Sequence, residues 1–249
     1  MALLKILLLL GLGVSVNSDI SLQKRIIGGQ NCDEGERLYH VRLEITRGER
    51  KEGCGGSLIH PEWILTSAHC MAEPGWIIVA LFKVHPRTII RYDQVIQQGP
   101  VIYTRDGQQH DIMLLKLETP VTDVPLAQLP DCRRRLSRGD IVQLAGEGAT
   151  TAGPNNQRLS ANPIPPQLQC VDMRVIQFSG FIPTYGHVFY AEAPNKDICF
   201  GDTGGAAMHN GMIYGVISLG QPDHACQRPV AILDVCEYLA WIQQTTGIQ

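Results

Sequence analysis

The sequence predicts an all-β protein, a barrel or a sandwich of many short strands, with one helix at the C-terminal end. Three observations support this prediction. Short apolar runs are separated by turn residues along most of the chain. The 25 glycines and 15 prolines supply residues for those turns. The 249 residues are enough for one large β domain or two small ones, and no internal repeat or low-complexity linker divides them.

Four segments carry the strand pattern most clearly. Residues 40–45 alternate between polar and apolar side chains, as expected of a strand with one buried face. Residues 63–66 and 112–115 are compact apolar runs, and residues 212–218 form a longer one. Runs of this kind are typical of buried strands.

Only the end of the chain has helical spacing. Between residues 236 and 246, the side chains of Tyr238, Leu239, Trp241 and Ile242 can share one face of a helix. We therefore expect one α-helix, at the C-terminus.

The first residues have the parts of a signal peptide in their usual order. A basic residue, Lys5, precedes an apolar run over residues 6–14, and mostly small residues suited to cleavage follow up to Ser18. The run is too short to span a hydrocarbon core about 30 Å thick, and no later stretch approaches about 20 apolar residues. We therefore expect residues 1–18 to be removed and the protein to be secreted and extracellular, with no membrane partner.

The charge and the cysteine content narrow the class of protein. A formal net charge of −3 and a pI near 6.2 argue against nucleic acid as an obligatory partner. Eight cysteines, an even number, indicate disulfides in a secreted chain. There is no Cys-x-x-Cys pair of the kind that binds zinc, and no acidic cluster resembles a calcium loop, so we predict no metal and no cofactor.

Three short motifs resemble those of one enzyme family. Residues 201–205, Gly-Asp-Thr-Gly-Gly, resemble the nucleophile loop of the trypsin/chymotrypsin serine proteases, in which the middle residue is serine. Residues 66–70, Thr-Ser-Ala-His-Cys, and residues 110–114, His-Asp-Ile-Met-Leu, resemble that family's histidine and aspartate segments, in the chymotrypsin order. The resemblance covers residues 24–249. It implies two six-stranded antiparallel β-barrels with a C-terminal α-helix, in a protease-like domain of residues 26–249.

The resemblance assigns roles to individual residues. His69 would be the general base, and Asp111 would orient its imidazole. The backbone N–H groups of Gly201 and Thr203 would form the oxyanion hole, which does not depend on the side chain at position 203. Thr203 itself would stand where the family has its nucleophile.

Thr203 departs from the family's serine by one methyl group on Cβ. The branch restricts χ1, and the methyl must share a crowded space with the reacting hydroxyl. A displacement of about 1 Å can cost about 10²-fold in rate. Other hydrolases use threonine with its own terminal amine as the base, which an internal residue cannot supply. We therefore expect strongly reduced peptidase activity.

The segment before the protease-like domain resembles an activation propeptide. Residues 19–25 end in a basic pair, and cleavage after Arg25 by an activating protease would free the amino group of Ile26. By resemblance, that ammonium would pair with Asp202 and order the oxyanion loop.

The specificity pocket also departs from the family. By resemblance, Asp197 would lie at the base of the pocket, where trypsin-like members select lysine or arginine, while Ser218 and Gly220 would belong to the strand that pairs with substrate. Val230 falls where such members have glycine, so it should fill the slot above Asp197. The alternative interpretation is that Asp197 is a solvated loop charge. Glu147 is a third departure, since the family has tryptophan between the two glycines.

The family likeness also implies a pairing of the cysteines; spacing alone leaves many connectivities open. The implied disulfides are Cys32–Cys170, Cys54–Cys70, Cys132–Cys236 and Cys199–Cys226.

A short basic run lies beside Cys132. It consists of Arg133, Arg134, Arg135 and Arg138. Such a run is typical of a solvated loop; the alternative is contact with an acidic partner or a sulfated glycan.

Three hypotheses of function follow. The first is a secreted, monomeric serine protease homologue with impaired catalysis that acts by binding a protein or peptide ligand. The second is a slow trypsin-like endopeptidase that uses Thr203 as its nucleophile. The third is an extracellular polyanion-binding protein that uses the arginines between Arg133 and Arg138.

Overall fold

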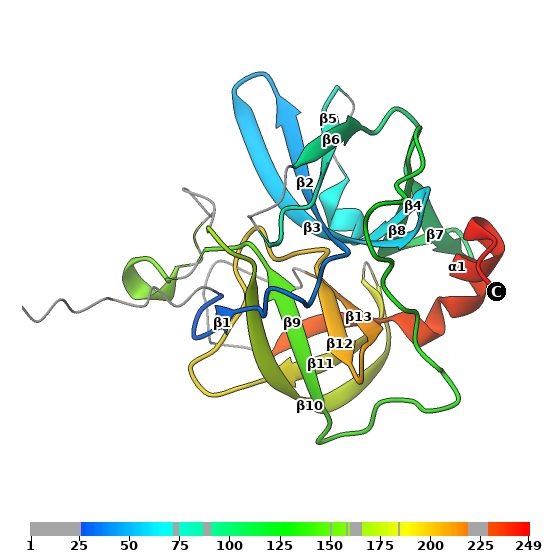
Figure 1. Cartoon of the computed structure of the whole chain (residues 1–249). Coiled ribbons are helices and arrows are strands. Elements are labelled where there is room, and N and C mark those ends of the chain that lie inside the picture. The colour runs from blue at the N-terminus through cyan, green and yellow to red at the C-terminus, as the bar shows by residue number, and fades with distance from the viewer. Residues whose placement is uncertain are drawn as a thin grey trace, which may run out of the picture.

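The predicted all-β class is confirmed by a computed structural model. Its described residues form two sheets that lie side by side, followed by one α-helix (Figure 1). The predicted signal peptide and propeptide lie outside the described part of the chain. The described residues are 26–71, 75–86, 91–149, 151–157, 159, 166–183, 185–218 and 229–249.

The first sheet comes from the N-terminal half of the chain and has the strand order β6-β5-β2-β3-β4-β8-β7. All its ladders are antiparallel. Its strands are β2 (His40–Arg47), β3 (Arg50–His60), β4 (Trp63–Thr66), β5 (Ile77–Phe82), β6 (Tyr92–Val95), β7 (Val101–Arg105) and β8 (Gln108–Lys116).

The second sheet closes on itself. Its order is β1-β10-β11-β14-β13-β12-β9, and β9 also pairs with β10, so six strands form a closed antiparallel barrel with β1 outside it. Its strands are β1 (Gln30–Asn31), β9 (Ile141–Gly146), β10 (Gln169–Ile182), β11 (Gly186–Glu192), β12 (Ala206–His209), β13 (Met212–Ile217) and β14 (Val230–Asp234).

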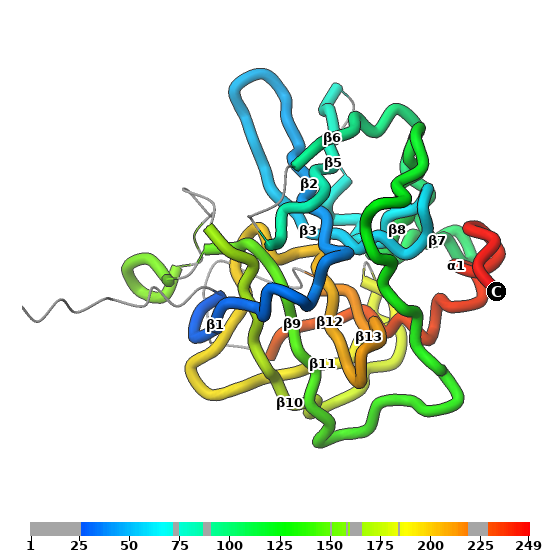
Figure 2. The backbone as a smooth tube through the Cα atoms, in the orientation of Figure 1, coloured from blue at the N-terminus to red at the C-terminus, as the bar shows by residue number. Residues whose placement is uncertain are grey.

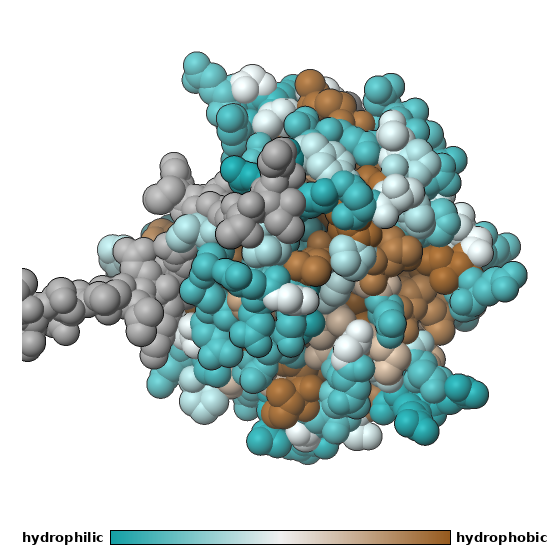
Figure 3. Space-filling view, viewed as in Figure 1, coloured by the Kyte–Doolittle hydropathy of each residue, from teal (hydrophilic) through white to brown (hydrophobic). Residues whose placement is uncertain are grey.

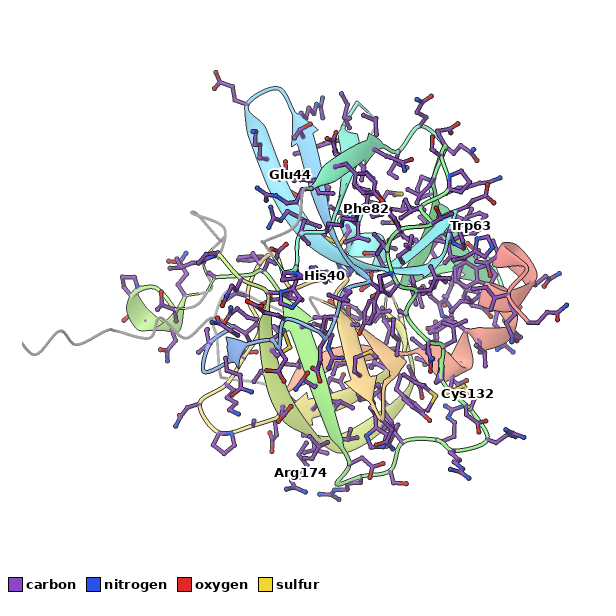
Figure 4. All side chains as sticks on the ribbon, viewed as in Figure 1. His40, Glu44, Trp63, Phe82, Cys132 and Arg174 are labelled. Carbon is purple, nitrogen blue, oxygen red and sulfur yellow. A yellow bond between two sulfur atoms is a disulfide. The ribbon has the colours of Figure 1, made fainter. Side chains whose placement is uncertain are left out.

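The strand β2 shows how the two halves meet. Its apolar residues Val41 and Leu43 are fully buried in the core of the first sheet, as the alternating pattern predicts. Its polar residues His40 and Arg42 are also buried, at 2% and 5% exposed. Their face of the strand is turned toward the second sheet, and His40 lies between the two halves (Figure 4). Because both faces of β2 are covered, its polar side chains are buried. Period-two alternation alone would assign these side chains to solvent.

The C-terminal helix is shorter than the sequence pattern predicts. The helix α1 spans Leu239–Thr246, because Val235–Glu237 form a 3₁₀ turn, η3, and Gly247 ends the helix in a left-handed conformation. Two further 3₁₀ turns are η1 (Ala68–Cys70) and η2 (Pro154–Asn156). The chain trace brings α1 beside the end of β7 (Figure 2), where Trp241 packs edge-on against Tyr103. None of the helices in the described ranges is long and apolar enough to cross a membrane.

Three disulfides cross-link described segments of the chain. They are Cys32–Cys170, Cys54–Cys70 and Cys132–Cys236, as the family likeness implies. Cys199 is buried, but Cys226 lies outside the described residues, so the fourth bond stays a prediction. Most of the periphery of the visible face is hydrophilic, and hydrophobic residues are concentrated toward the middle of this face and toward α1 (Figure 3).

Candidate active site

His69 and Asp111 are brought together where the first sheet meets the η1 turn. The Nδ1 atom of His69 lies 2.8 Å from Oδ1 of Asp111, and the backbone N–H of His69 donates to the same oxygen at 2.7 Å. The hydroxyl of Ser67 donates to Oδ1 at 2.6 Å, and that of Ser218 donates to Oδ2. Asp111 is 2% exposed. These donors fix the buried carboxylate, and the carboxylate in turn fixes which nitrogen of the imidazole faces it.

The same contact changes the proton affinity of His69. Its hydrogen bond to the Asp111 carboxylate raises the pKa of the imidazole, and the raising effect outweighs the opposing effect of partial burial. The stabilisation that this pairing gives the folded state is therefore complete below the ordinary pKa of histidine, and it is lost as the pH rises through the raised value.

Replacing Asp111 by Asn should lower the pKa of His69, because the charged partner of the imidazolium disappears while the side-chain shape is kept. The titration of the His69 ring followed by NMR measures this change. The matched control is Asp106→Asn, because Asp106 is an exposed carboxylate whose charged partner is Arg105. An unchanged His69 titration in Asp111→Asn would show that the ion pair is not what sets it.

The nucleophile loop packs so tightly that two of its positions require glycine. Gly204 has φ +83°, and a Cβ there would lie 2.2 Å from the carbonyl oxygen of Gly55 and 2.2 Å from the hydroxyl of Thr66. A Cβ at Gly205 would lie 2.3 Å from the carbonyl oxygen of Ala145. The N–H of Gly55 donates to the carbonyl of Thr203 at 2.7 Å. The loop is therefore held between β3 of the first sheet and β9 of the second.

The residues predicted to form the oxyanion hole, Gly201 and Thr203, lie on either side of Asp202 in this loop. Gly201 has φ +104°, and the carboxylate of Asp202 accepts the N–H groups of Gly148 and Cys199 at 2.7 and 2.8 Å. Within the described ranges, neither the N–H of Gly201 nor that of Thr203 has a hydrogen-bonded partner. Two backbone donors without partners in one tight loop are what stabilisation of an oxyanion needs.

Thr203, the predicted third member of the triad, lies near the histidine segment but, in the described part of the chain, is not hydrogen-bonded to His69. Its carbonyl oxygen lies 3.6 Å from Sγ of Cys70, the residue after His69, so the loop and the histidine segment are neighbours. Thr203 is 5% exposed. Between described residues, the structure has no hydrogen bond from the Thr203 hydroxyl to the His69 imidazole, whereas His69 and Asp111 are paired.

The first residue of the protease-like domain is buried inside the second barrel. Ile26 is fully buried, and the carbonyl of Ile27 accepts the N–H of Asp197 at 3.1 Å. Asp202 is fully buried as well. Arg25 lies outside the described residues, so the role of cleavage in this arrangement stays a prediction.

The residues predicted for the specificity pocket are buried. Asp197 is 1% exposed, and its carboxylate accepts the N–H of Ile198 at 2.8 Å, so the alternative of a solvated loop charge is wrong. Val230 is 4% exposed and belongs to the same apolar cluster as Ile198 and Ile217. The side chain of Val230 therefore packs in the interior, in the apolar cluster that also includes Ile198, the residue after Asp197. Gly220 lies outside the described residues.

Glu147 has a buried partner that sequence analysis missed. Arg42 donates from Nε to Oε2 of Glu147 at 2.7 Å and from a second nitrogen to Oε1, and both residues are about 95% buried. The Nε2 atom of His40 lies 3.8 Å from the same carboxylate. The ion pair joins β2 of the first sheet to the residue after β9 of the second, next to Gly148, which holds Asp202. The sequence carries no signal of this partner, because the alternation over residues 40–45 assigns Arg42 to the solvent face.

The pKa of Glu147 reflects this pairing. Burial acts to raise it, but the contacts with His40 and Arg42 outweigh burial and lower it from 4.5 to about 2. Since the folded-state pKa is depressed, the pair stabilises the fold fully above about pH 4.5, and this contribution is lost as the pH falls toward 2.

The free energy of unfolding of the Glu147→Gln variant should therefore depend less steeply on pH in acid than that of the native protein. Between about pH 4.5 and 2, the free energy of unfolding of the native protein should fall more steeply than that of the variant, because the native protein takes up one more proton on unfolding. Denaturant unfolding at several pH values measures both slopes. Glu118→Gln, at an exposed glutamate, is the control, and equal slopes for native protein and Glu147→Gln would contradict the assignment.

Two arginines of the basic run already have acidic partners. Arg133 pairs with Asp131 at 2.9 Å, and Arg135 pairs with Asp234 at 2.7 Å and also with Glu237. Their charge is thus partly neutralised within the chain. Among the described residues, no group of three His, Cys, Asp or Glu side chains is placed to hold a metal ion.

Comparisons with known proteins agree on one family. The family model described as Trypsin matches residues 26–242. The cationic trypsin-3 of Rattus norvegicus is 30% identical over 90% of this chain and 90% of its own length. The trypsin of Sus scrofa is 30% identical over 89% of this chain and 95% of its own length. Kallikrein-5 of Homo sapiens is 29% identical over 94% of this chain and 80% of its own length.

Proposed function

Since this chain belongs to the trypsin family, we propose that it is a secreted homologue of trypsin-like serine proteases with impaired catalysis, which acts by binding a protein or peptide ligand. The supporting observation is the contrast around His69. The imidazole is paired with Asp111, yet no hydrogen bond between described residues reaches it from the hydroxyl of Thr203. A general base that is not linked to its nucleophile leaves the hydroxyl without activation.

The pocket supports the same proposal. Selection of a basic side chain needs an open path to the Asp197 carboxylate. Val230 is buried in the apolar cluster of Ile198, and both Val230 and Asp197 are almost without exposure. A ligand is therefore expected to bind through its extended backbone along the segment of Ser218, which directly follows the strand Met212–Ile217, rather than through a long basic side chain.

Secretion and activation are parts of this proposal. Three disulfides fit an oxidising, extracellular environment, and residues 1–18 have the order of a signal peptide. The match to the family model begins at Ile26, directly after Arg25, which fits removal of residues 19–25 by an activating protease.

A slow endopeptidase with Thr203 as nucleophile is the second candidate, and the intact pairing of His69 with Asp111 favours it. Polyanion binding by Arg133–Arg138 is a weaker candidate because Arg133 and Arg135 already pair with carboxylates. Salt-sensitive heparin retention that is lost in Arg133→Ala/Arg135→Ala would support it.

The deciding experiment is turnover of peptide esters by the Arg25-cleaved protein and by its Thr203→Ser variant. Activity that appears only with serine supports a binding protein with impaired catalysis. Brisk hydrolysis by the native protein that is abolished in Thr203→Ala would contradict the proposal. It would show instead that the protein is an endopeptidase with Thr203 as its nucleophile.

A further inference from the structure

The tip of the β10–β11 hairpin lies against the ring of His69. Tyr185, in the turn between these strands, stacks on the imidazole with 5.6 Å between the ring centroids and 12° between the ring planes. This nearly parallel arrangement is one that offset aromatic pairs prefer. The side chain of His69 is 41% exposed, and Tyr185 is half-buried, so the stacked pair lies at the surface of the site.

The backbone of Tyr185 is fixed by the same residue that orients His69. The N–H of Asp111 donates to the carbonyl of Tyr185 at 3.0 Å, while the Asp111 carboxylate holds Nδ1 of His69. The N–H of Tyr185 donates to the carbonyl of Ile182 at 3.1 Å and closes the turn. The stacking ring and the carboxylate are thus held by one short segment of β8.

A second anchor holds the far side of the turn. Tyr238, at the start of α1, is 1% exposed; its hydroxyl accepts the N–H of His187 at 2.8 Å and lies 3.0 Å from Nδ1 of His110. Gly186 has φ +96°, and a Cβ there would lie 2.3 Å from the Tyr238 hydroxyl and 2.6 Å from Nδ1 of His110. Only glycine fits at this position, so the backbone of Gly186 packs directly against Tyr238 and His110.

Within the described ranges, the ionic and aromatic contacts of the imidazole come from two side chains. In the described part of the chain, the titratable groups that face it are Asp111, from β8, and Tyr185, from the hairpin. Asp111 holds one edge of the ring, and the hydroxyl of Thr203 does not hold the other. Rotation about the Asp111 contact is then opposed by the aromatic ring that lies on the face of the imidazole.

We propose that Tyr185 is a positioning residue for His69, which holds the imidazole in line with Asp111 by stacking on its face. An aromatic face also favours the cationic form of a group stacked on it. The role of Tyr185 in holding the ring does not depend on whether the protein cuts its ligand; only its effect on turnover rests on the proposed function.

The test compares Tyr185→Leu with Tyr185→Phe by NMR titration of the His69 ring, assigned with His69→Gln. Tyr185→Leu should lower the pKa of His69 by about 0.5, because the stacked ring no longer stabilises the imidazolium. Tyr185→Phe should keep the native titration, because it keeps the ring. In the Thr203→Ser background, Tyr185→Leu should lower kcat about tenfold with little change in KM, because it displaces the base rather than the ligand.

Phe178→Leu is the matched control, since Phe178 is an exposed aromatic residue of the same hairpin that packs on Phe189 and not on His69. A native His69 titration in Tyr185→Leu, or equal effects of Tyr185→Leu and Tyr185→Phe, would overturn the proposal. If neither Thr203→Ser nor Thr203→Ser/Val230→Gly shows turnover, the proposal about catalysis fails, and the NMR titration still decides the role of Tyr185.

Discussion

The Thr203→Ser variant of the Arg25-cleaved protein should hydrolyse peptide esters at least about 10²-fold faster than the native protein. Threonine adds a methyl to a residue that is only 5% exposed. The loop has no room to adjust, because a Cβ at Gly204 would already meet Gly55 and Thr66 at 2.2 Å. The methyl must therefore displace the hydroxyl rather than the loop, and removing it should let the oxygen turn toward His69. Initial rates on a series of peptide esters measure the gain.

Two further variants make this result decisive. Thr203→Ala removes the hydroxyl altogether, so its residual rate defines what the oxyanion hole and binding supply alone. If the serine variant remains inactive, Val230→Gly should be added to it, because Val230 is buried in the apolar cluster that includes Ile198, the residue after Asp197. Activity in Thr203→Ser/Val230→Gly alone would place the main block in the pocket, and equal rates for native protein and Thr203→Ser/Val230→Gly would contradict both arguments.

Arg42→Met should be the most destabilising of these changes, costing about 3–5 kcal/mol of folding free energy. The substitution keeps an unbranched apolar chain, but it leaves the Glu147 carboxylate, 6% exposed, without its main cationic partner. For a chain of this size the cost corresponds to a melting temperature lower by roughly 10 °C. Differential scanning calorimetry at neutral pH measures the change.

The double variant Arg42→Met/Glu147→Gln separates loss of pairing from loss of packing. It removes both charges, so it should cost clearly less than the sum of the two single variants. Additive costs would show that the two side chains do not act as a pair. Arg47→Met, at the exposed end of the same strand, reports the cost of removing an arginine from β2 outside the interface.

The sequence predicts those parts of the site that lie in short continuous motifs. His69 and Asp111 were assigned from five-residue segments, and the structure brings them into contact. The strand Trp63–Thr66 was predicted with its observed bounds because a buried strand is a continuous apolar run. Local backbone shape depends on residues that are adjacent in the sequence, and so does a run of apolar side chains. Both can therefore be recognised without a structure.

Contacts between distant segments could not be predicted in the same way. Arg42 and Glu147 are separated by 105 residues, and nothing near either residue indicates the other. Tyr185 belongs to a hairpin whose position over His69 depends on Tyr238 at the far end of the chain. The burial of His40 depends on a second sheet that local alternation cannot reveal. These features arise only when the two halves come together.

The strand β2 limits which parts of the molecule can be exchanged for those of a relative. On one face, Val41 and Leu43 pack in the core of the first sheet. On the other face, Arg42 binds the carboxylate of Glu147, which follows β9 of the second sheet. The halves are therefore not interchangeable modules. A graft that brought in a foreign N-terminal half without this arginine would leave the buried Glu147 carboxylate unpaired, next to Gly148, whose N–H binds Asp202.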